Sequence, residues 1–366
     1  MEIETHEGGS QAAEAEGRAL LLAAEAELRA RFRAEAKAAF ENGYEEDIEG
    51  EDAELVLDPL AFQAREFRET WNDLWYGPFN DTTNIRPMRF TDNKPEQHHS
   101  ASPCTTLQIF SVEVARIKRD LEWPLHVYGM VALRDSIDNK RNVIFNHSRD
   151  NCQILTEEVS YLKLTGPSRA VVLIDPVTVE VDLKVKGSTE SEDKHLSFLA
   201  VPFMTNVPLH SFLLKRRYAS KLSTMRFKLG LLVDSLEATI TVRVARGSWP
   251  DDRRAQFAVR TASICGEEVI LLDSGDSEVP VAGDGSIMLS RCVASVELRG
   301  ELKVSVKSWK GADNVVNDEE IFKPKEAGRS YGTLDVGFCQ MDVTVAWVYQ
   351  LSATVLSPQH YEMKFP

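Results

Sequence analysis

Strict alternation of apolar and polar residues between Val177 and Val185 is the clearest structural signal in this chain. Every second position is Val or Leu, and the positions between them hold Thr, Glu, Asp and Lys. Successive side chains of a β-strand point to opposite sides. The pattern therefore predicts a strand with one face in a core and the other face in water.

Short apolar runs separated by turn residues continue through the rest of the chain. Many short strands with frequent turns are typical of a sandwich or barrel and not of alternating strands and helices. We therefore predict a mainly β protein that folds as an antiparallel β-sandwich. The predicted strands include 106–115, 125–133, 142–146, 162–164, 178–186, 225–232, 238–245 and 286–289.

Three short matches suggest that the β region is duplicated. Their separations of 118, 122 and 119 residues are nearly constant, which favours two tandem sandwiches, here divided as 104–218 and 219–366. One larger two-sheet domain is the alternative. The matched pairs are Thr106-Leu107 with Thr224-Met225, Ser168-Arg169 with Ser290-Arg291, and Leu183-Lys184-Val185 with Leu302-Lys303-Val304.

Two segments precede the β region. Residues 1–54 are predicted to be an acidic tail with helical and disordered character, and residues 55–103 an amphipathic helix followed by a polar linker. Asp58 can cap that helix and Pro59 suits its first turn. Its apolar stripe either packs on the sheet or binds a partner. The candidate partner-binding residues on the stripe are Phe67, Trp71 and Trp75.

The net charge of -15 is concentrated in the tail, because residues 1–54 account for -11 of it and leave -4 for the remaining residues. Such acidity disfavours nonspecific binding of the whole molecule to nucleic acids and to anionic membranes, but says little about the folded part. The chain has no apolar run long enough for a transmembrane helix and no signal peptide at its start. We therefore predict a cytoplasmic protein that binds neither DNA nor membranes.

Residues that could carry chemistry are scattered. Leu271-Leu272-Asp273-Ser274-Gly275 is similar to an aspartic protease loop, which makes Asp273 the candidate for an unrecognised hydrolase, although no second copy is present. Aspartates near strand ends could instead bind calcium, and Trp123, Trp249 and Trp309 could stack on sugars. Turns and packing explain these residues equally well, so we assign no catalytic, cofactor or metal residue. The calcium candidates are Asp135, Asp138, Asp251, Asp252, Asp273 and Asp276.

Several sequence blocks resemble a plant family, expanded in grasses, that is catalogued as a domain of unknown function. The blocks are Thr106 to Val112, Gly129 to Asp135, Asn142 to Asn146, Leu164 to Ala170 and Asp182 to Gly187. Similar domains form the C-terminal part of a jasmonate-induced cereal protein whose N-terminal part is an rRNA N-glycosidase. The resemblance implies a stress or defence setting near the translation machinery and assigns no catalytic residue.

Taken together, these observations predict a non-enzymatic, intracellular interaction module of plant stress or defence, with a protein partner and a possible ribosome association. The alternatives are an enzyme or toxin-linked partner in translation control, and a β-sandwich that binds calcium or carbohydrate.

Overall fold

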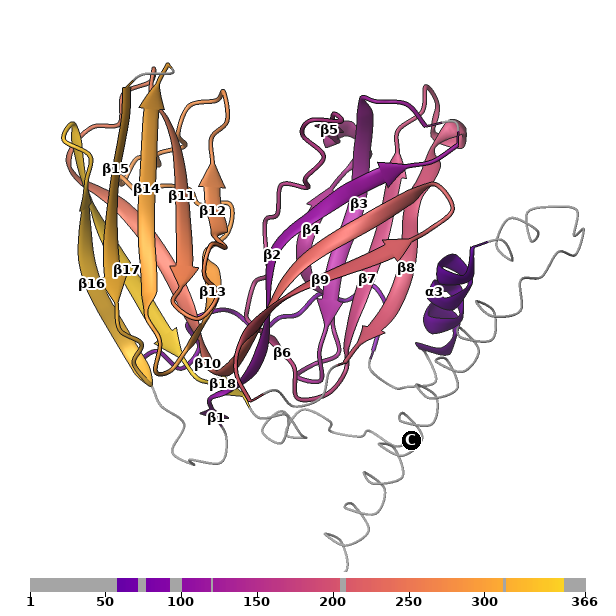
Figure 1. Cartoon of the computed structure of the whole chain (residues 1–366), viewed down its shortest axis with the longest axis horizontal. Helices are drawn as coiled ribbons and strands as arrows, with labels where there is room; N and C mark the ends of the chain where they lie inside the picture. The colour runs from indigo at the N-terminus through magenta and orange to yellow at the C-terminus, as the bar shows by residue number, and fades with distance from the viewer. Residues whose placement is uncertain are drawn as a thin grey trace, which may run out of the picture.

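The computed structural model describes residues 58–71, 77–92, 101–119, 121–204, 209–311 and 314–351. These residues form two antiparallel β-sandwiches that stand side by side, with one helix against the outer side of the first sandwich (Figure 1). The mainly β prediction is confirmed. The predicted acidic tail and Trp75 lie outside the described residues.

The first sandwich contains β2 to β9 and the first half of β10, and the second contains the second half of β10 and β11 to β17. The strands of the first are β2 (Cys104–Ile117), β3 (Leu125–Arg134), β4 (Asn142–His147), β5 (Gln153–Leu155), β6 (Val171–Val172), β7 (Val177–Val185), β8 (Lys194–Phe203) and β9 (Phe212–Ala219). The shared strand is β10 (Ser223–Gly247). The strands of the second are β11 (Arg254–Thr261), β12 (Val269–Asp273), β13 (Val293–Glu297), β14 (Leu302–Lys310), β15 (Asn314–Phe322), β16 (Ala327–Asp335) and β17 (Cys339–Val348). The remaining elements are α3 (Pro59–Thr70), the 3-10 turns η2 (Arg149–Asn151) and η3 (Glu190–Glu192), and the short pair β1 (Ala101–Ser102) and β18 (Gln350–Leu351).

The two sandwiches have the same strand order, as expected for tandem copies. One sheet of the first runs β4-β3-β7-β8, and one sheet of the second runs β12-β11-β14-β15. The other two sheets run β9-β10-β2-β6 and β16-β17-β10-β13. The first half of β10 therefore closes the first sandwich, and its second half opens the second.

Only one of the three sequence matches falls at equivalent places. Ser168-Arg169 precedes β6 and Ser290-Arg291 precedes β13, which are corresponding strands. The Thr106 match is wrong because the counterpart of β2 is the second half of β10, whereas Thr224 lies in its first half. The Leu183 match is also wrong, because Leu183 lies near the end of β7 whereas Leu302 begins β14.

The shared strand β10 replaces two separate predicted strands, 225–232 and 238–245. Asp234 lies between them with a positive φ of 47°, and the register with β2 shifts between Leu232 and Ser235. An irregular residue of this kind bends a strand without ending it. The division at 218/219 stays a prediction about folding units, and β10 runs through both sandwiches.

Each sandwich has its own apolar core, and β7 shows how the sequence pattern produces it. Val177, Val179, Val181 and Leu183 are fully buried in the core of the first sandwich. The expectation that the other face lies in water is wrong at Glu180, whose side chain is buried between two arginines. The reason is that α3 and residues 77–92 cover this part of the sheet.

Helix α3 begins where the sequence predicts it. One carboxylate oxygen of Asp58 accepts hydrogen bonds from the amides of Leu60 and Ala61 at 3.2 and 3.3 Å, and Pro59 occupies the first turn. The helix packs on β8, the edge strand of its sheet (Figure 1). It therefore covers a strand that would otherwise present an open face to solvent.

Candidate functional site

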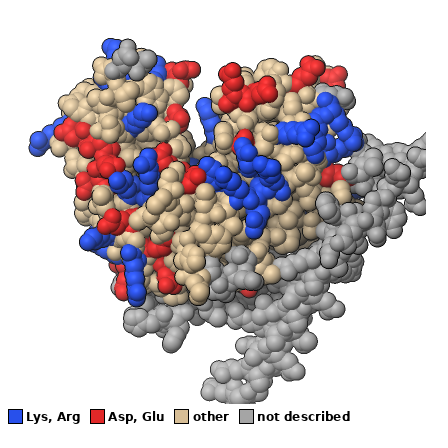
Figure 2. Space-filling view, viewed as in Figure 1, with Lys and Arg blue, Asp and Glu red and all other residues tan. Residues whose placement is uncertain are grey.

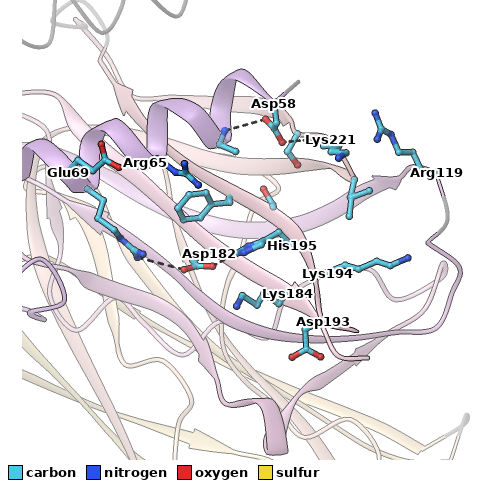
Figure 3. A pocket seen from close by; sticks show the side chains of 16 residues that line it. Asp58, Arg65, Glu69, Arg119, Asp182, Lys184, Asp193, Lys194, His195 and Lys221 are labelled. Carbon is cyan, nitrogen blue, oxygen red and sulfur yellow. Dashed lines mark hydrogen bonds and ion pairs between the residues drawn. The ribbon is translucent and has the colours of Figure 1, made fainter. Parts of the chain in front are cut away.

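A cleft of about 860 Å³ lies between α3, the outer face of β7 and β8, and the turn that joins β9 to β10 (Figure 3). Six Lys or Arg residues and four Asp or Glu residues line it. The basic residues are Arg65, Arg68, Arg119, Lys184, Lys194 and Lys221, and the acidic residues are Asp58, Glu69, Asp182 and Asp193. The remaining lining residues include His195, Phe198 and Leu222.

The carboxylates of the cleft are largely committed to holding the fold. Asp58 caps α3, and its second oxygen accepts a hydrogen bond of 2.7 Å from the backbone amide of Lys221. Asp182 lies 3.8 Å from both Arg68 and His195 (Figure 3). These contacts join the helix, the sheet and the β9–β10 turn around the cleft.

Asp193 is the most firmly held of these carboxylates. It accepts hydrogen bonds from Arg149 Nε at 2.8 Å, from the hydroxyl of Tyr128, and from the backbone amide of Gly187 at 2.7 Å. The Arg149 hydrogen bond, followed by those from Tyr128 and Gly187, holds the pKa of Asp193 well below its usual range. Burial, together with the bond to Asp193, raises the pKa of Tyr128 to about 12. Asp193 therefore remains ionised, and its charge is already matched by Arg149.

Several cations of the cleft have no such match. Within the described part of the chain, Lys184, Lys194 and Arg119 form no ion pair. Lys184 lies opposite His195 on neighbouring strands, so both side chains share the face toward α3 (Figure 3). The cleft consequently has an unneutralised positive charge beside the apolar surface of Phe198, over which Arg68 lies at 5.8 Å. Such a surface suits an anionic ligand that also carries apolar groups.

Phe67 and Trp71, two of the three predicted partner-binding aromatic residues, do not line this cleft. Trp71 is 2% exposed, donates a hydrogen bond of 2.8 Å to the carbonyl of Gly77, and packs edge-on against Phe67 and Phe79. Phe67 is half-buried in the same cluster, and Trp75 lies outside the described residues. Trp71 therefore packs within the fold, which is one of the two roles considered for the apolar stripe of this helix.

The side chain of Arg134 connects this aromatic cluster to the sheet. Its guanidinium lies 4.3 Å from the ring centre of Trp71 and 4.6 Å from that of Phe79, and its Nε is 2.8 Å from Glu180. Arg134 also donates to the carbonyl of Phe79 at 2.6 Å. A cation enclosed between aromatic faces and a carboxylate fixes residues 77–92 to the first sandwich.

The hydrolase candidate Asp273 and two of the calcium candidates, Asp135 and Asp138, have structural roles. The two oxygens of Asp273 accept hydrogen bonds from the amide of Gly275 at 2.9 Å and from Gln256 at 3.3 Å, as in a turn. Asp135 and Asp138 bind the guanidinium of Arg169 at 2.6 to 3.1 Å. No group of three or more metal-binding side chains occurs among the residues that the structure describes.

Comparison with known families identifies the β region. A family described as "Domain of unknown function (DUF6598)" matches residues 106–345, which is more than half of the chain. The chain belongs to this family. The DUF6598 domain thus spans both sandwiches, from near the start of β2 to near the end of β17. A search of curated proteins finds no match.

Solved structures show only weak similarity to the DUF6598 protein. Human GIVD cytosolic phospholipase A2 aligns with 68% of this chain and 31% of its own, at 12% identity and a TM-score of 0.21. The two C2 domains of extended-synaptotagmin 2 align with 71% of this chain and 96% of theirs, at 12% identity and a TM-score of 0.23. The chain therefore covers about a third of the phospholipase, and scores this low carry no functional argument.

The cations of the cleft are the functional candidates that sequence reasoning missed. Arg65 and Arg68 are three residues apart on α3, so a helical plot places them on neighbouring positions. Lys184 and Lys194 belong to different strands, and Arg119 to a loop. Only the fold brings these groups together. No helix within the described ranges is long and apolar enough to cross a membrane.

Proposed function

We propose that this protein is a non-enzymatic interaction module that binds an acidic segment of a partner protein in the cleft between α3 and β8. The observation that carries the proposal is the set of cations Lys184, Lys194 and Arg119, which have no carboxylate partner in the described part of the chain. Three of the four carboxylates of the cleft, Asp58, Asp182 and Asp193, already contact other groups of the protein.

A peptide suits the shape and chemistry of the cleft. The cleft lies between a helix and a sheet face and is bounded by Leu222 as well as by the cations. Glu and Asp side chains of an extended segment would pair with the lysines, and their apolar neighbours would contact Phe198 and Leu222. Complementary charge of this kind mainly contributes specificity and a high association rate.

We extend the proposal to a cytoplasmic role in plant stress or defence. Support comes from the sequence blocks that resemble the grass-expanded plant family, whose relatives include a jasmonate-induced protein with an rRNA N-glycosidase part. A ribosomal protein that carries an acidic segment is one partner that would fit the cations of the cleft. The turn geometry of Asp273 favours binding over the alternative of a hydrolase.

The test measures binding of a fluorescein-labelled decaglutamate peptide to the full chain by fluorescence anisotropy. We expect the double variant Lys184→Glu with Lys194→Glu to bind at least ~10-fold more weakly than the wild type, about 1.4 kcal/mol. Binding should also weaken as salt is raised, because salt screens charges at the surface.

The matched control is Lys307→Glu, an exposed lysine on β14 in the second sandwich. It reverses one charge away from the cleft, half the change of the double variant, and should bind like the wild type. Equal losses in both variants would point to net charge instead of a site. Failure of the wild-type chain to bind decaglutamate would refute the acidic-peptide proposal.

A further inference from the structure

The outer face of β9 and β10 in the first sandwich carries a second group of cations, separate from the cleft. We define this basic face by Lys215 and Arg217 on β9, Arg226 and Lys228 on β10, and Tyr161 beside β2. The neighbouring residues Phe227 and Leu229 point into the core, so the four cations point outward. Figure 2 shows Lys and Arg gathered over β9 and β10, whereas both signs are interspersed on the second sandwich.

The strand register places like charges directly opposite each other on this face. Arg217 pairs with Arg226, and Lys215 pairs with Lys228. Opposed like charges destabilise a sheet. Two such pairs concentrate positive charge on this face, and this concentration indicates an anionic ligand.

Only the β10 members of these pairs are neutralised. Arg226 forms a bidentate ion pair with Glu113 on β2, and Lys228 lies 3.0 Å from Glu267. Lys215 and Arg217 have no carboxylate partner among the residues that the structure describes. The edge of the sheet therefore presents two unmatched cations to solvent.

An aromatic ring completes the row across the sheet. The register runs from Arg217 through Arg226 and Glu113 to Tyr161, which is 45% exposed. Glu113 holds Arg226 in place between the two ends of the row. One end thus offers a charge for a phosphate, and the other offers an aromatic face.

We propose that the basic face binds single-stranded nucleic acid. Lys215 and Arg217 would pair with backbone phosphates, while an unpaired base would stack on Tyr161. Proteins that bind single strands combine these two elements, a cationic surface along the backbone and aromatic rings for the bases. A duplex keeps its bases stacked within the helix, so it can use the cations but not the ring.

The test titrates the full chain with a fluorescein-labelled 12-nucleotide oligouridylate and follows anisotropy at several salt concentrations. Each cation that pairs with a single-strand phosphate contributes about -0.7 to the slope of log K against log salt. We expect Lys215→Gln with Arg217→Gln to weaken binding and to make this slope shallower by about 1.4, twice that contribution. Lys307→Gln on the second sandwich, a control that removes one such charge elsewhere, should change neither quantity.

Variants of Tyr161 test the aromatic half of the proposal. We expect Tyr161→Ala to weaken binding about ten-fold, in line with the stacking contribution of one base, and Tyr161→Phe to retain it. The double variant Lys184→Glu with Lys194→Glu should bind oligouridylate like the wild type, which separates this face from the peptide cleft. A labelled 12-nucleotide oligothymidylate is measured in parallel. Comparison of the two affinities shows whether the basic face prefers RNA or DNA.

Three results would overturn the proposal. The first is that neither oligonucleotide binds, and the second is that the Lys215 and Arg217 variant binds as the wild type does. The third is that unlabelled decaglutamate or a 12-base-pair RNA duplex displaces oligouridylate as well as unlabelled oligouridylate does. That third outcome would mark a general anion surface.

Discussion

The carboxylate of Asp58 accepts a hydrogen bond from the backbone amide of Lys221, 163 residues further along the chain. The same carboxylate caps α3 through Leu60 and Ala61. One side chain therefore sets both the start of the helix and its position against the β9–β10 turn. These contacts join two walls of the cleft.

Asp58→Ala should destabilise the protein by about 1 to 2 kcal/mol, because the helix loses its cap. Asp58→Asn keeps an oxygen for the cap but has one acceptor fewer for Lys221, so an intermediate loss is expected. Urea denaturation measures both. Equal stability of the Asn and Ala variants would mean that the cap contributes nothing and the Lys221 contact carries the whole effect.

Trp71→Ala should cost about 3 to 5 kcal/mol, because it removes a buried aromatic side chain from the Arg134 and Phe79 cluster. Trp71→Phe should cost less, since a ring remains over Arg134. Phe62→Ala is the control on the same helix, at a side chain that is 45% exposed, and should change stability by about 0.5 kcal/mol at most. Thermal and urea denaturation report the values. Unchanged stability of Trp71→Ala with lost partner binding would instead support a partner-binding Trp71.

Asp193 should make the stability depend on pH on the acidic side. Its pKa is lower in the folded protein than in the unfolded chain, so it stabilises the fold above the unfolded value of ~3.9. This contribution is lost as pH falls from that value through the folded pKa. Asp193→Asn should therefore be less stable than the wild type near neutral pH, and the difference should shrink in strong acid. A difference that stayed constant from pH 7 to pH 2 would exclude this role for the charge of Asp193.

The two corresponding arginines should respond differently to removal. Arg169→Met leaves the fully buried side chain of Asp135 without its partner, which should cost about 3 to 5 kcal/mol. Arg291 donates to the carbonyl of Ile109 at 2.7 Å, and burial lowers its pKa to about 10. Arg291→Met should therefore cost only about 1 kcal/mol, the usual contribution of one hydrogen bond. Calorimetric melting compares the stability of the two variants directly. A larger loss of stability for Arg291→Met would contradict the greater structural role given to Arg169.

Core strands with regular alternation are predictable from this sequence, and β7 is the best case. Strands β9, β15 and β16 are missing from the prediction because they lie at sheet edges, where polar and charged side chains occupy both faces. The run Lys215-Arg216-Arg217 hides β9 in this way. Charged side chains at a sheet edge prevent pairing with other chains. They also remove the alternation of apolar and polar residues by which a strand is recognised.

Sequence reasoning also missed the continuity of β10 and the composition of the cleft. Val233-Asp234-Ser235 interrupts alternation, and only the pairing of β10 with β2 on one side and β17 on the other shows that the chain continues through it. Lys184 and Lys194 look like ordinary surface residues until the fold places α3 beside them. Pairing partners and long-range neighbours are not encoded in local periodicity.

Because β10 belongs to both sandwiches, the two copies are joined by a continuous strand and not by a separate linker. A break within one half of β10 would shorten a strand of one sandwich, and a break at Asp234 would leave each sandwich its strands but separate the two. Changes to the loops or outer faces of one sandwich leave β10 intact, whereas a change that distorts β10 acts on both sandwiches. A further copy could join in the same way only if the last strand of the array, here β17, were extended into the first strand of the newcomer.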